Sequence, residues 1–293
     1  MVAGARKLSD VAIMGRDGPG GRPAASELRL RATSSVALAA VAVATAWTGG
    51  WPLAAIWLGA GMAVAMEWLA MTRAEPKRPL AAVALVGLAA LQIAFIAGSA
   101  ATVMIAAIVI AAATLIVAAG QRDRAWALSG LAYAAAIAVV PVAVRAGPGG
   151  AAALFWMFAV VWSTDIAAYF TGRAFGGPKL WPAVSPKKTW SGFVGGLLGA
   201  TLAGVAVAVA AERAGVVLPV GLIAIAAISA VVSVASQVGD FAESGMKRRF
   251  GVKDSGTLIP GHGGFMDRLD GFAAVALLVG LVLAAASLSA GTP

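Results

Sequence analysis

The sequence predicts an all-α, polytopic membrane protein with about nine transmembrane helices and a polar cavity that opens to the cytoplasmic side. Hydrophobic residues fill 60% of the 293 positions and charged residues only 12%, whereas globular domains average about 45–50% and about 25%. Apolar stretches of roughly the length that crosses a bilayer recur along the chain. Their many alanines and glycines predict helices that approach one another closely.

Nine apolar spans are expected in order along the chain. They cover residues 34–48, 51–72, 80–98, 99–118, 125–144, 151–170, 193–211, 216–238 and 271–289. Residues 1–32 precede them and are polar and basic, which predicts a disordered cytoplasmic tail. The remainder, 33–293, is expected to form a single transmembrane domain whose catalytic part is about 151–290.

The basic residues predict how the spans are oriented. If the tail lies inside and the spans alternate, all but Arg145 and Arg213 of the 22 lysines and arginines fall on the inner side. Such a bias is typical of cytoplasmic loops. We therefore expect a multi-pass protein of the cytoplasmic (inner) membrane with a cytoplasmic N-terminus. The polar loops 171–192 and 239–270 then both face the cytoplasm.

Composition restricts the chemistry of any metal site. The chain has no cysteine and one histidine, so disulfides, thiolate sites and an all-histidine zinc site are excluded. A metal would take oxygen ligands, which favours magnesium, manganese or calcium. The net charge of +9 is divided among short patches between the spans, which indicates loops at the membrane surface and argues against nucleic acid as a partner.

Charge is concentrated between residues 240 and 270, which hold five acids, five bases and the only histidine. Because charge inside a bilayer is costly, this segment should lie at the surface or line a wet cavity. If the eighth span continues as a helix past Gly239, one helix face carries Asp240, Ser244, Lys247 and Arg248. The helix is expected to end at Phe250-Gly251.

A glycine-rich turn over 259–264 follows and suits backbone contacts to an anion. Asp267 and Asp270 then share a face at the start of the last span. Together with Asp240 they would hold one or two divalent cations, while nearby bases bind phosphates. The alternative is a solvated loop with local ion pairs, such as Glu243 with Lys247. His262, inside the turn, would either transfer protons or brace the turn.

The other polar loop begins after Asp165, an acid in the apolar sixth span that indicates function. A carboxylate paired with Arg173 is the alternative. Residues 185–189 offer two hydroxyl and two ammonium groups that suit a phosphate or an anionic lipid headgroup, from Ser185, Lys187, Lys188 and Thr189. Here the alternative is that the lysines only set the topology. Glu67, in the second span near its cytoplasmic end, is interpreted as an acid that either snorkels to the interface or has a structural role.

At these residues the chain resembles the phosphatidate cytidylyltransferase (CDP-diacylglycerol synthase) family. The fixed positions of that family's C-terminal signature are all filled, by Ser244, Lys247, Arg248, Lys253, Asp254, Gly256, Ile259, Pro260, His262, Gly263, Gly264, Asp267, Arg268 and Asp270. A block upstream is also similar, with Asp165, Ala168, Tyr169, Gly172, Gly176, Lys179 and residues 185–189. One position departs from the family, because Ser191 stands where a glutamate is common.

The resemblance implies that CTP and phosphatidate react to give CDP-diacylglycerol and pyrophosphate, with Mg²⁺ as cofactor. We expect Asp240, Asp267 and Asp270 to hold one or two metal ions, a monovalent ion being compatible as well. The groups expected to bind phosphates or the leaving pyrophosphate are Lys247, Arg248, Lys253 and Arg268. An already ionised lipid phosphate needs little help from a base, so a catalytic role for His262 has weaker support.

Lys187 and Lys188 would contact phosphatidate or CTP, and Asp165 would orient one of them. The further binding positions are Ser185, Ser244, Asp254, Gly263 and Gly264. Membrane lipids are expected as partners, and the oligomeric state stays open, a homodimer included.

Two other functions compete with this interpretation. A CTP-dependent polyprenol or lipid kinase would share the nucleotide site but attack the γ-phosphorus and release CDP. A transporter would carry acids spread over several mid-membrane helices. The acids of this chain gather instead in cytoplasmic loops, which disfavours transport.

Overall fold

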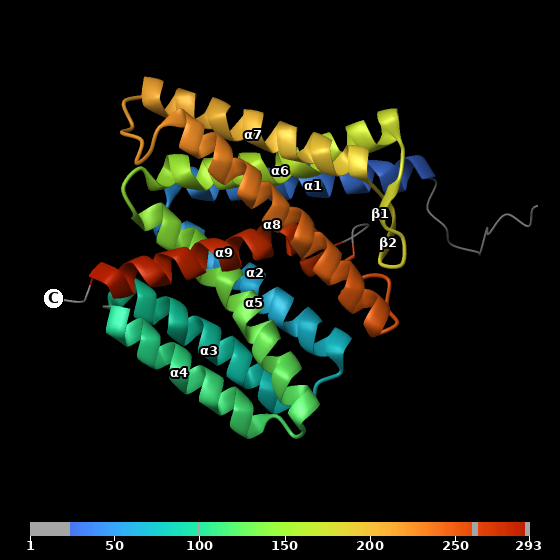
Figure 1. The fold of residues 1–293 in the computed structure, drawn as a ribbon. Coiled ribbons are helices and arrows are strands. Elements are labelled where there is room, and N and C mark those ends of the chain that lie inside the picture. Colours follow the sequence, from blue (N-terminus) through green and yellow to red (C-terminus); the bar gives the residue numbers. More distant parts are fainter. Residues whose placement is uncertain (1–23, 99, 260–262, 291–293) are drawn as a thin grey trace, which may run out of the picture.

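The computed structural model describes residues 24–98, 100–259 and 263–290. In these ranges the chain forms α1 (Ala24–Thr48), α2 (Gly50–Thr72), α3 (Lys77–Ala97), α4 (Ala100–Val117), α5 (Gln121–Ala146), α6 (Gly150–Phe175), β1 (Lys179–Trp181), β2 (Ser185–Thr189), α7 (Trp190–Arg213), α8 (Leu222–Arg249) and α9 (Met266–Ala290) (Figure 1). The predicted order of nine helices is confirmed in this part of the chain.

The helices are those of a polytopic membrane protein. In the described ranges, seven are long and apolar enough to cross a bilayer, and the apolar stretches Thr33–Thr48 and Thr102–Val117 are shorter. The tail predicted for 1–32 lies outside the described residues up to residue 23, whereas residues 24–32 are helical and belong to α1. The eighth span begins at Leu222 instead of 216, because Pro219 and Gly221 interrupt the helix before it.

The fold is nearly all α-helical, as predicted, and a small β-hairpin lies between α6 and α7. β1 pairs antiparallel with β2, with Lys179 opposite Thr189 and Trp181 opposite Ser185. Prolines at 182 and 186 remove backbone donors that a helix needs. The segment between α6 and α7 therefore folds back on itself, and β2 leads directly into α7.

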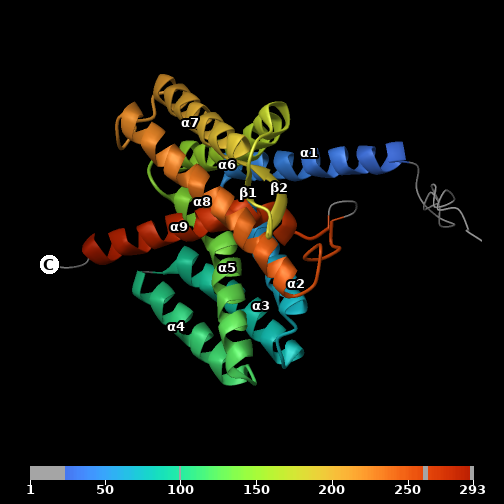
Figure 2. The same ribbon diagram turned by 45° about the vertical axis from the view of Figure 1, so that its right-hand side comes forward.

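Small residues let the helices pack closely, as predicted. A Cβ on Gly199 of α7 would lie 2.5 Å from the Cβ of Ala167 on α6. A Cβ on Gly61 of α2 would lie 2.8 Å from the carbonyl oxygen of Ala134 on α5. Figures 1 and 2 show α6 and α7 side by side and α3 and α4 at the opposite side of the bundle, with α8 and α9 crossing between the two groups.

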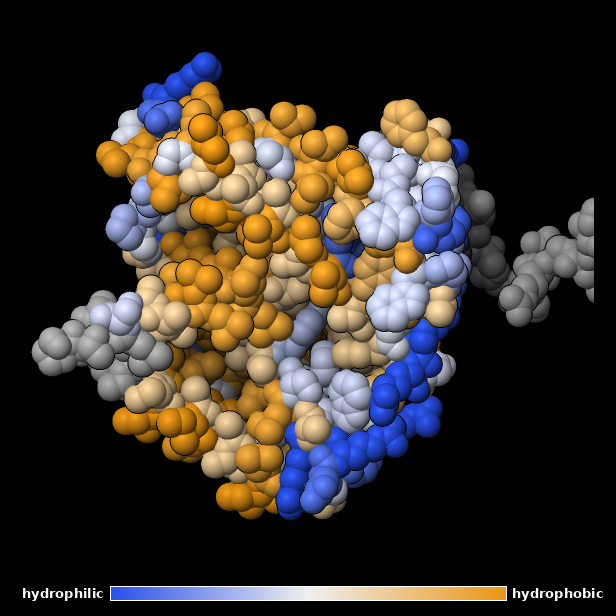
Figure 3. Space-filling model, viewed as in Figure 1, coloured by the Kyte–Doolittle hydropathy of each residue, from blue (hydrophilic) through white to orange (hydrophobic). Residues whose placement is uncertain are grey.

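Three aromatic rings fill the centre, where α2, α6 and α9 meet. The centroid of Trp57 lies 4.9 Å from that of Phe272 and 5.9 Å from that of Phe158. Away from this core the surface in Figure 3 is mostly apolar, as lipid contact requires, and hydrophilic side chains gather toward the end of the molecule that carries the hairpin and the C-terminal end of α8.

Candidate active site

The C-terminal end of α8 supplies a row of charged side chains. The helix continues past Gly239 to Arg249, as predicted, and then ends before Gly251, whose φ of 68° suits glycine. Gly239 allows α8 to approach α9, because a Cβ there would lie 2.7 Å from the carbonyl oxygen of Asp270. This close crossing brings the acids of the two helices into one region.

Asp267, in the first turn of α9, is the most heavily bonded of these acids. Its Oδ1 lies 2.7 Å from Lys247 Nζ. Its Oδ2 accepts bonds of 2.9 Å from the backbone N–H groups of Ser255 and Gly264 and from the Ser255 hydroxyl. The glycine-rich turn thus directs a backbone N–H at an anion, as predicted, but the anion in this structure is a side chain of the protein.

Asp240 pairs with the hairpin. Lys188 of β2 forms an ion pair with Asp240 Oδ2, and Ser244 Oγ lies 3.5 Å from Asp240 Oδ1. The ammonium group of Lys188 also lies 4.1 Å from the centre of the Phe241 ring. The two side chains of the pair are 27% and 33% exposed, although the ammonium nitrogen of Lys188 is itself buried.

A second acid pair is enclosed between α8 and α9. Glu243 is 2% exposed, and neither of its carboxylate oxygens accepts a hydrogen bond from the residues that the structure describes. Lys247 Nζ lies 3.4 Å from Glu243 Oε1, so the predicted Glu243–Lys247 pair is confirmed, although it is buried and not solvated. The carboxyl group of Asp270 neighbours Glu243 and accepts a 2.8 Å bond from the N–H of Gly271.

The predicted metal ligands are therefore close together but not gathered around one point. Among the described residues, no group of three or more histidines and carboxylates is arranged to hold a metal ion. Lysines instead neutralise Asp240 and Asp267. The chemistry of the set still fits a hard cation, because the donors of Asp240, Asp267 and Asp270 are all carboxylate oxygens.

A polar cavity of about 450 Å³ lies between α6, the hairpin, α7 and α8. Its charged lining consists of Asp165, Arg173, Lys187, Lys188 and Asp240, and the neutral polar lining includes Tyr169, Thr189 and Gln237. Arg173 Nη1 donates a 3.0 Å bond to the Tyr169 hydroxyl and forms no salt bridge with Asp165. The structure thus brings together the predicted residues of the first loop and Asp240.

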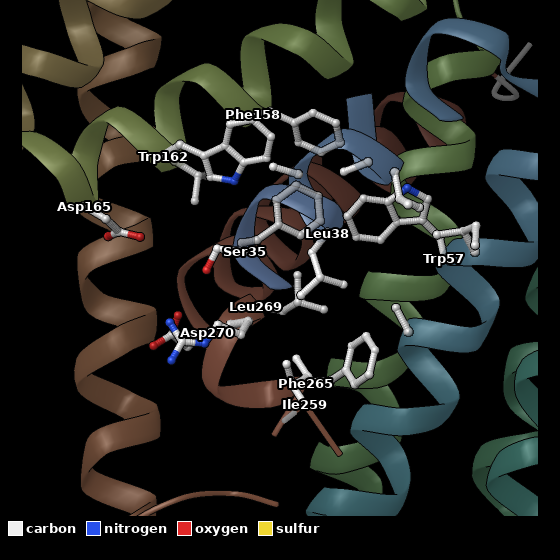
Figure 4. Close-up of a pocket in the computed structure, with 18 residues that line it drawn as sticks. Ser35, Leu38, Trp57, Phe158, Trp162, Asp165, Ile259, Phe265, Leu269 and Asp270 are labelled. Carbon is white, nitrogen blue, oxygen red and sulfur yellow. The ribbon is translucent and has the colours of Figure 1, made fainter. Parts of the chain in front are cut away.

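An apolar cavity of about 220 Å³ adjoins it and shares one side chain, Asp165. Figure 4 shows Asp165 and Asp270 at one side of this cavity and Leu38, Trp57 and Phe158 at the other. Arg268 also lines it. The site therefore has a basic, polar compartment and an apolar compartment, and Asp165 lies where they meet.

Ser191, the position at which the chain departs from the family that it resembles, lies where the first polar loop leads into α7. The Ser191 hydroxyl contacts Thr189 Oγ1 at 3.0 Å and the carbonyl oxygen of Gly176. Thr189 Oγ1 in turn accepts the N–H of Gly192 at 3.1 Å and caps α7. Ser191 thus has a local structural role here.

Other predicted residues lie outside the two cavities. Arg248, Lys253 and Asp254 are exposed and line neither cavity. Ser185 pairs with Trp181 within the hairpin. His262 lies outside the described residues, so its predicted role stays a prediction.

Sequence reasoning gave too little weight to Glu67. This acid of α2 is 4% exposed and contacts the loop that leads into α9. The available signal was that Glu67 is a lone acid in an apolar helix. Its bonding partners could not be predicted, because they lie 198 and 199 residues further along the chain.

Comparison with known proteins gives consistent matches. The model of the Cytidylyltransferase family matches residues 29–286. Phosphatidate cytidylyltransferases of Brucella suis biovar 1 and Brucella melitensis biotype 1 are each 40% identical over 259 residues, which cover 87% of this chain and 92% of theirs. The Bacillus subtilis phosphatidate cytidylyltransferase is 44% identical over 119 residues, 41% of this chain and 42% of that protein.

Proposed function

This chain belongs to the cytidylyltransferase family, and from that premise we propose that it joins CTP to phosphatidate, with CDP-diacylglycerol and pyrophosphate as products. It is a nucleotidyltransferase of phospholipid synthesis. The relatives that it matches over most of their length carry this name.

The observation that carries the proposal is the position of Asp165, which lines both of two adjoining cavities. One is lined by lysine and arginine side chains, which suit the triphosphate of a nucleotide. The other is lined by leucine, tryptophan and phenylalanine side chains, which suit acyl chains. A reaction between a water-soluble anion and a lipid phosphate needs both compartments to meet at one point.

The chemistry follows from the charges of the two substrates. An oxygen of the lipid phosphate attacks the α-phosphorus of CTP, a new P–O bond forms, and the bond to the β-phosphate oxygen breaks so that pyrophosphate leaves with the electron pair. Both reactants are anions, so the protein must offset their repulsion. Lys187, Lys188 and Arg173 line the polar cavity and are placed to do this.

We propose Mg²⁺ as the cofactor, because the acids offer the oxygen ligands that a hard cation takes. When bound, the ion would neutralise phosphate charge and polarise the bond that breaks. Asp240, Asp267 and Asp270 would hold it, and Glu243 offers further carboxylate oxygens beside Asp270. Lys188, which pairs with Asp240 and is a lining residue of the polar cavity, would then leave Asp240 for a substrate phosphate.

The remaining basic residues of the signature act at different points. Lys247 holds Asp267 in place, and Arg268 lines the apolar cavity, where it suits the lipid phosphate. Arg248 and Lys253 are exposed and would bind CTP or pyrophosphate only at the outer edge of the site.

The distribution of lysines and arginines along the chain supports an orientation of the protein in the membrane. We place the site and the N-terminus on the cytoplasmic side of the inner membrane, because alternating spans then assign all but two of the lysines and arginines in the sequence to that side. CTP is then available to the polar cavity, and phosphatidate enters from the inner leaflet.

Purified protein in detergent tests the proposal. With CTP, phosphatidate and Mg²⁺ it should release CDP-diacylglycerol and pyrophosphate in equal amounts, and each substrate should be required. Release of CDP together with a phosphorylated lipid would instead identify a CTP-dependent kinase. Absence of any product from folded protein would contradict the proposal.

A further inference from the structure

Glu67 of α2 caps the N-terminal end of α9. Its Oε1 accepts a 3.0 Å bond from the N–H of Phe265, and its Oε2 a 2.9 Å bond from the N–H of Met266. The first N–H groups of a helix have no carbonyl partner within the helix. A carboxylate there satisfies them and interacts favourably with the helix dipole. The cap is supplied from a distant helix and not from the residue that precedes α9.

Ser255 connects this cap to Asp267. Its hydroxyl oxygen lies 3.2 Å from Glu67 Oε2 and 2.9 Å from Asp267 Oδ2. A hydroxyl has one proton to donate, so the two carboxylates share a single donor. Ser255 is 6% exposed, and hydrogen bonds in such an environment hold their partners firmly. A shift of Glu67 therefore changes the position of Asp267.

Two glycines of the signature make room for the Glu67 carboxylate. A Cβ on Gly256 would lie 2.6 Å from Glu67 Oε1. A Cβ on Gly264 would collide with both Glu67 Oε2 and the Ser255 hydroxyl. These two positions need glycine because a Cβ has no space there, and not because of backbone conformation.

From these contacts we infer that Glu67 is a positioning residue for cytidylyl transfer. It fixes the start of α9 and, through Ser255, the carboxylate of Asp267 opposite Lys247. The first half of the chain thus contributes to a site whose sequence signature lies entirely within 240–270. The inference rests on the function proposed above for that site.

The test compares Glu67→Gln with a matched control, Glu212→Gln, an exposed glutamate at the far end of α7. Glutamine keeps the size of the side chain but turns an NH₂ group toward donors. We expect kcat per folded molecule to fall by about tenfold to hundredfold in Glu67→Gln, as for other residues that orient ligands, and the Mg²⁺ concentration for half-maximal rate to rise. Glu212→Gln should behave as the wild type, and Glu67→Asp should recover part of the rate.

The outcomes separate the inference from the function on which it rests. Failure of the wild type and Glu212→Gln to form CDP-diacylglycerol contradicts the function. An active wild type with an equally active Glu67→Gln overturns the inference, as does a lower melting temperature with unchanged kcat and Mg²⁺ dependence. If Glu67→Gln does not fold, Ser255→Ala decides, because it removes only the link between the acids. Unchanged kcat and Mg²⁺ dependence in Ser255→Ala overturn the inference, and a loss of rate with weaker Mg²⁺ activation supports it.

Discussion

The ammonium group of Lys247 lies 2.7 Å from Asp267 Oδ1 and joins the last turns of α8 to the first turn of α9. The same ammonium group lies 3.4 Å from Glu243 Oε1. One lysine thus pairs with two largely enclosed acids at the point where the helices cross. This cation therefore links Glu243 of α8 to Asp267 of α9.

Replacing Asp267 by asparagine should remove most of the Mg²⁺-dependent activity. The asparagine oxygen can keep the bonds from Ser255 and Gly264, while its NH₂ group faces Lys247 and cannot bind a cation. We expect a loss of about a hundredfold or more in kcat, because a divalent ion supplies several kcal/mol of charge stabilisation. Initial rates at saturating CTP and phosphatidate measure this loss in kcat. Asp123→Asn, in the first turn of α5, is the control, and near-normal turnover of Asp267→Asn would refute a ligand role.

Replacing Lys188 by methionine should weaken substrate binding at the polar cavity. The substitution removes a cation that contacts Asp240 and lines the cavity, and hydrogen bonds between ions are worth about 1.5–3 kcal/mol. We expect kcat/KM to fall by roughly tenfold to a hundredfold. Steady-state kinetics with CTP and phosphatidate varied in turn will show for which substrate kcat/KM falls. The control is Lys77→Met, an exposed position at the start of α3, which should leave kcat/KM for both substrates unchanged. If Lys188→Met keeps the kcat/KM of the wild type, Lys188 does not contact a substrate.

Filling the apolar cavity should affect the lipid and not the nucleotide. Ala60 lines that cavity, so phenylalanine at this position takes space from the acyl chains. We expect KM for long-chain phosphatidate to rise several-fold, since each buried methylene contributes about 0.8 kcal/mol, with KM for CTP unchanged. Phosphatidate with short acyl chains should restore the wild-type rate. An equal rise in KM for phosphatidate and for CTP would show that the cavity does not hold the lipid.

A glycine on α8 tests whether the close helix crossing matters for activity. In Gly239→Ala the added Cβ would lie 2.5 Å from the Cβ of Ala274, so α8 must move away from α9 and Asp240 from Asp270. Overpacking of this kind costs about 1–3 kcal/mol, and we expect a lower melting temperature together with a lower kcat. Gly245→Ala on the same helix is the control, because the nearest atom to its Cβ, on Val184, is 3.9 Å away. Equal rates in the two variants would contradict this view of the crossing.

Patterns within short segments predicted much of the fold. The apolar spans and the continuation of α8 beyond Gly239 depend on periodicity and length, which adjacent residues determine. The hairpin was not predicted, because β1 is only three residues long and prolines obscure its pattern. The first turn of α9 was predicted to follow the glycine-rich turn but not to be capped by α2.

The partners of each charged side chain could not be predicted from spacing. Asp240, Asp267 and Asp270 share a region as expected, yet Lys188 and Lys247 neutralise two of them. Glu67 bonds to Phe265 and Met266, residues that only the packing of α2 against α9 brings near. Such contacts depend on tertiary structure, which one sequence does not reveal.

Labelled CTP distinguishes transfer of the α-phosphorus from transfer of the γ-phosphorus. Wild-type protein is supplied with phosphatidate, Mg²⁺ and CTP that is labelled at either the α- or the γ-phosphorus. The account predicts that the α-label appears in the lipid product and the γ-label in pyrophosphate. Transfer of the γ-label to lipid, with the α-label left in CDP, would contradict it.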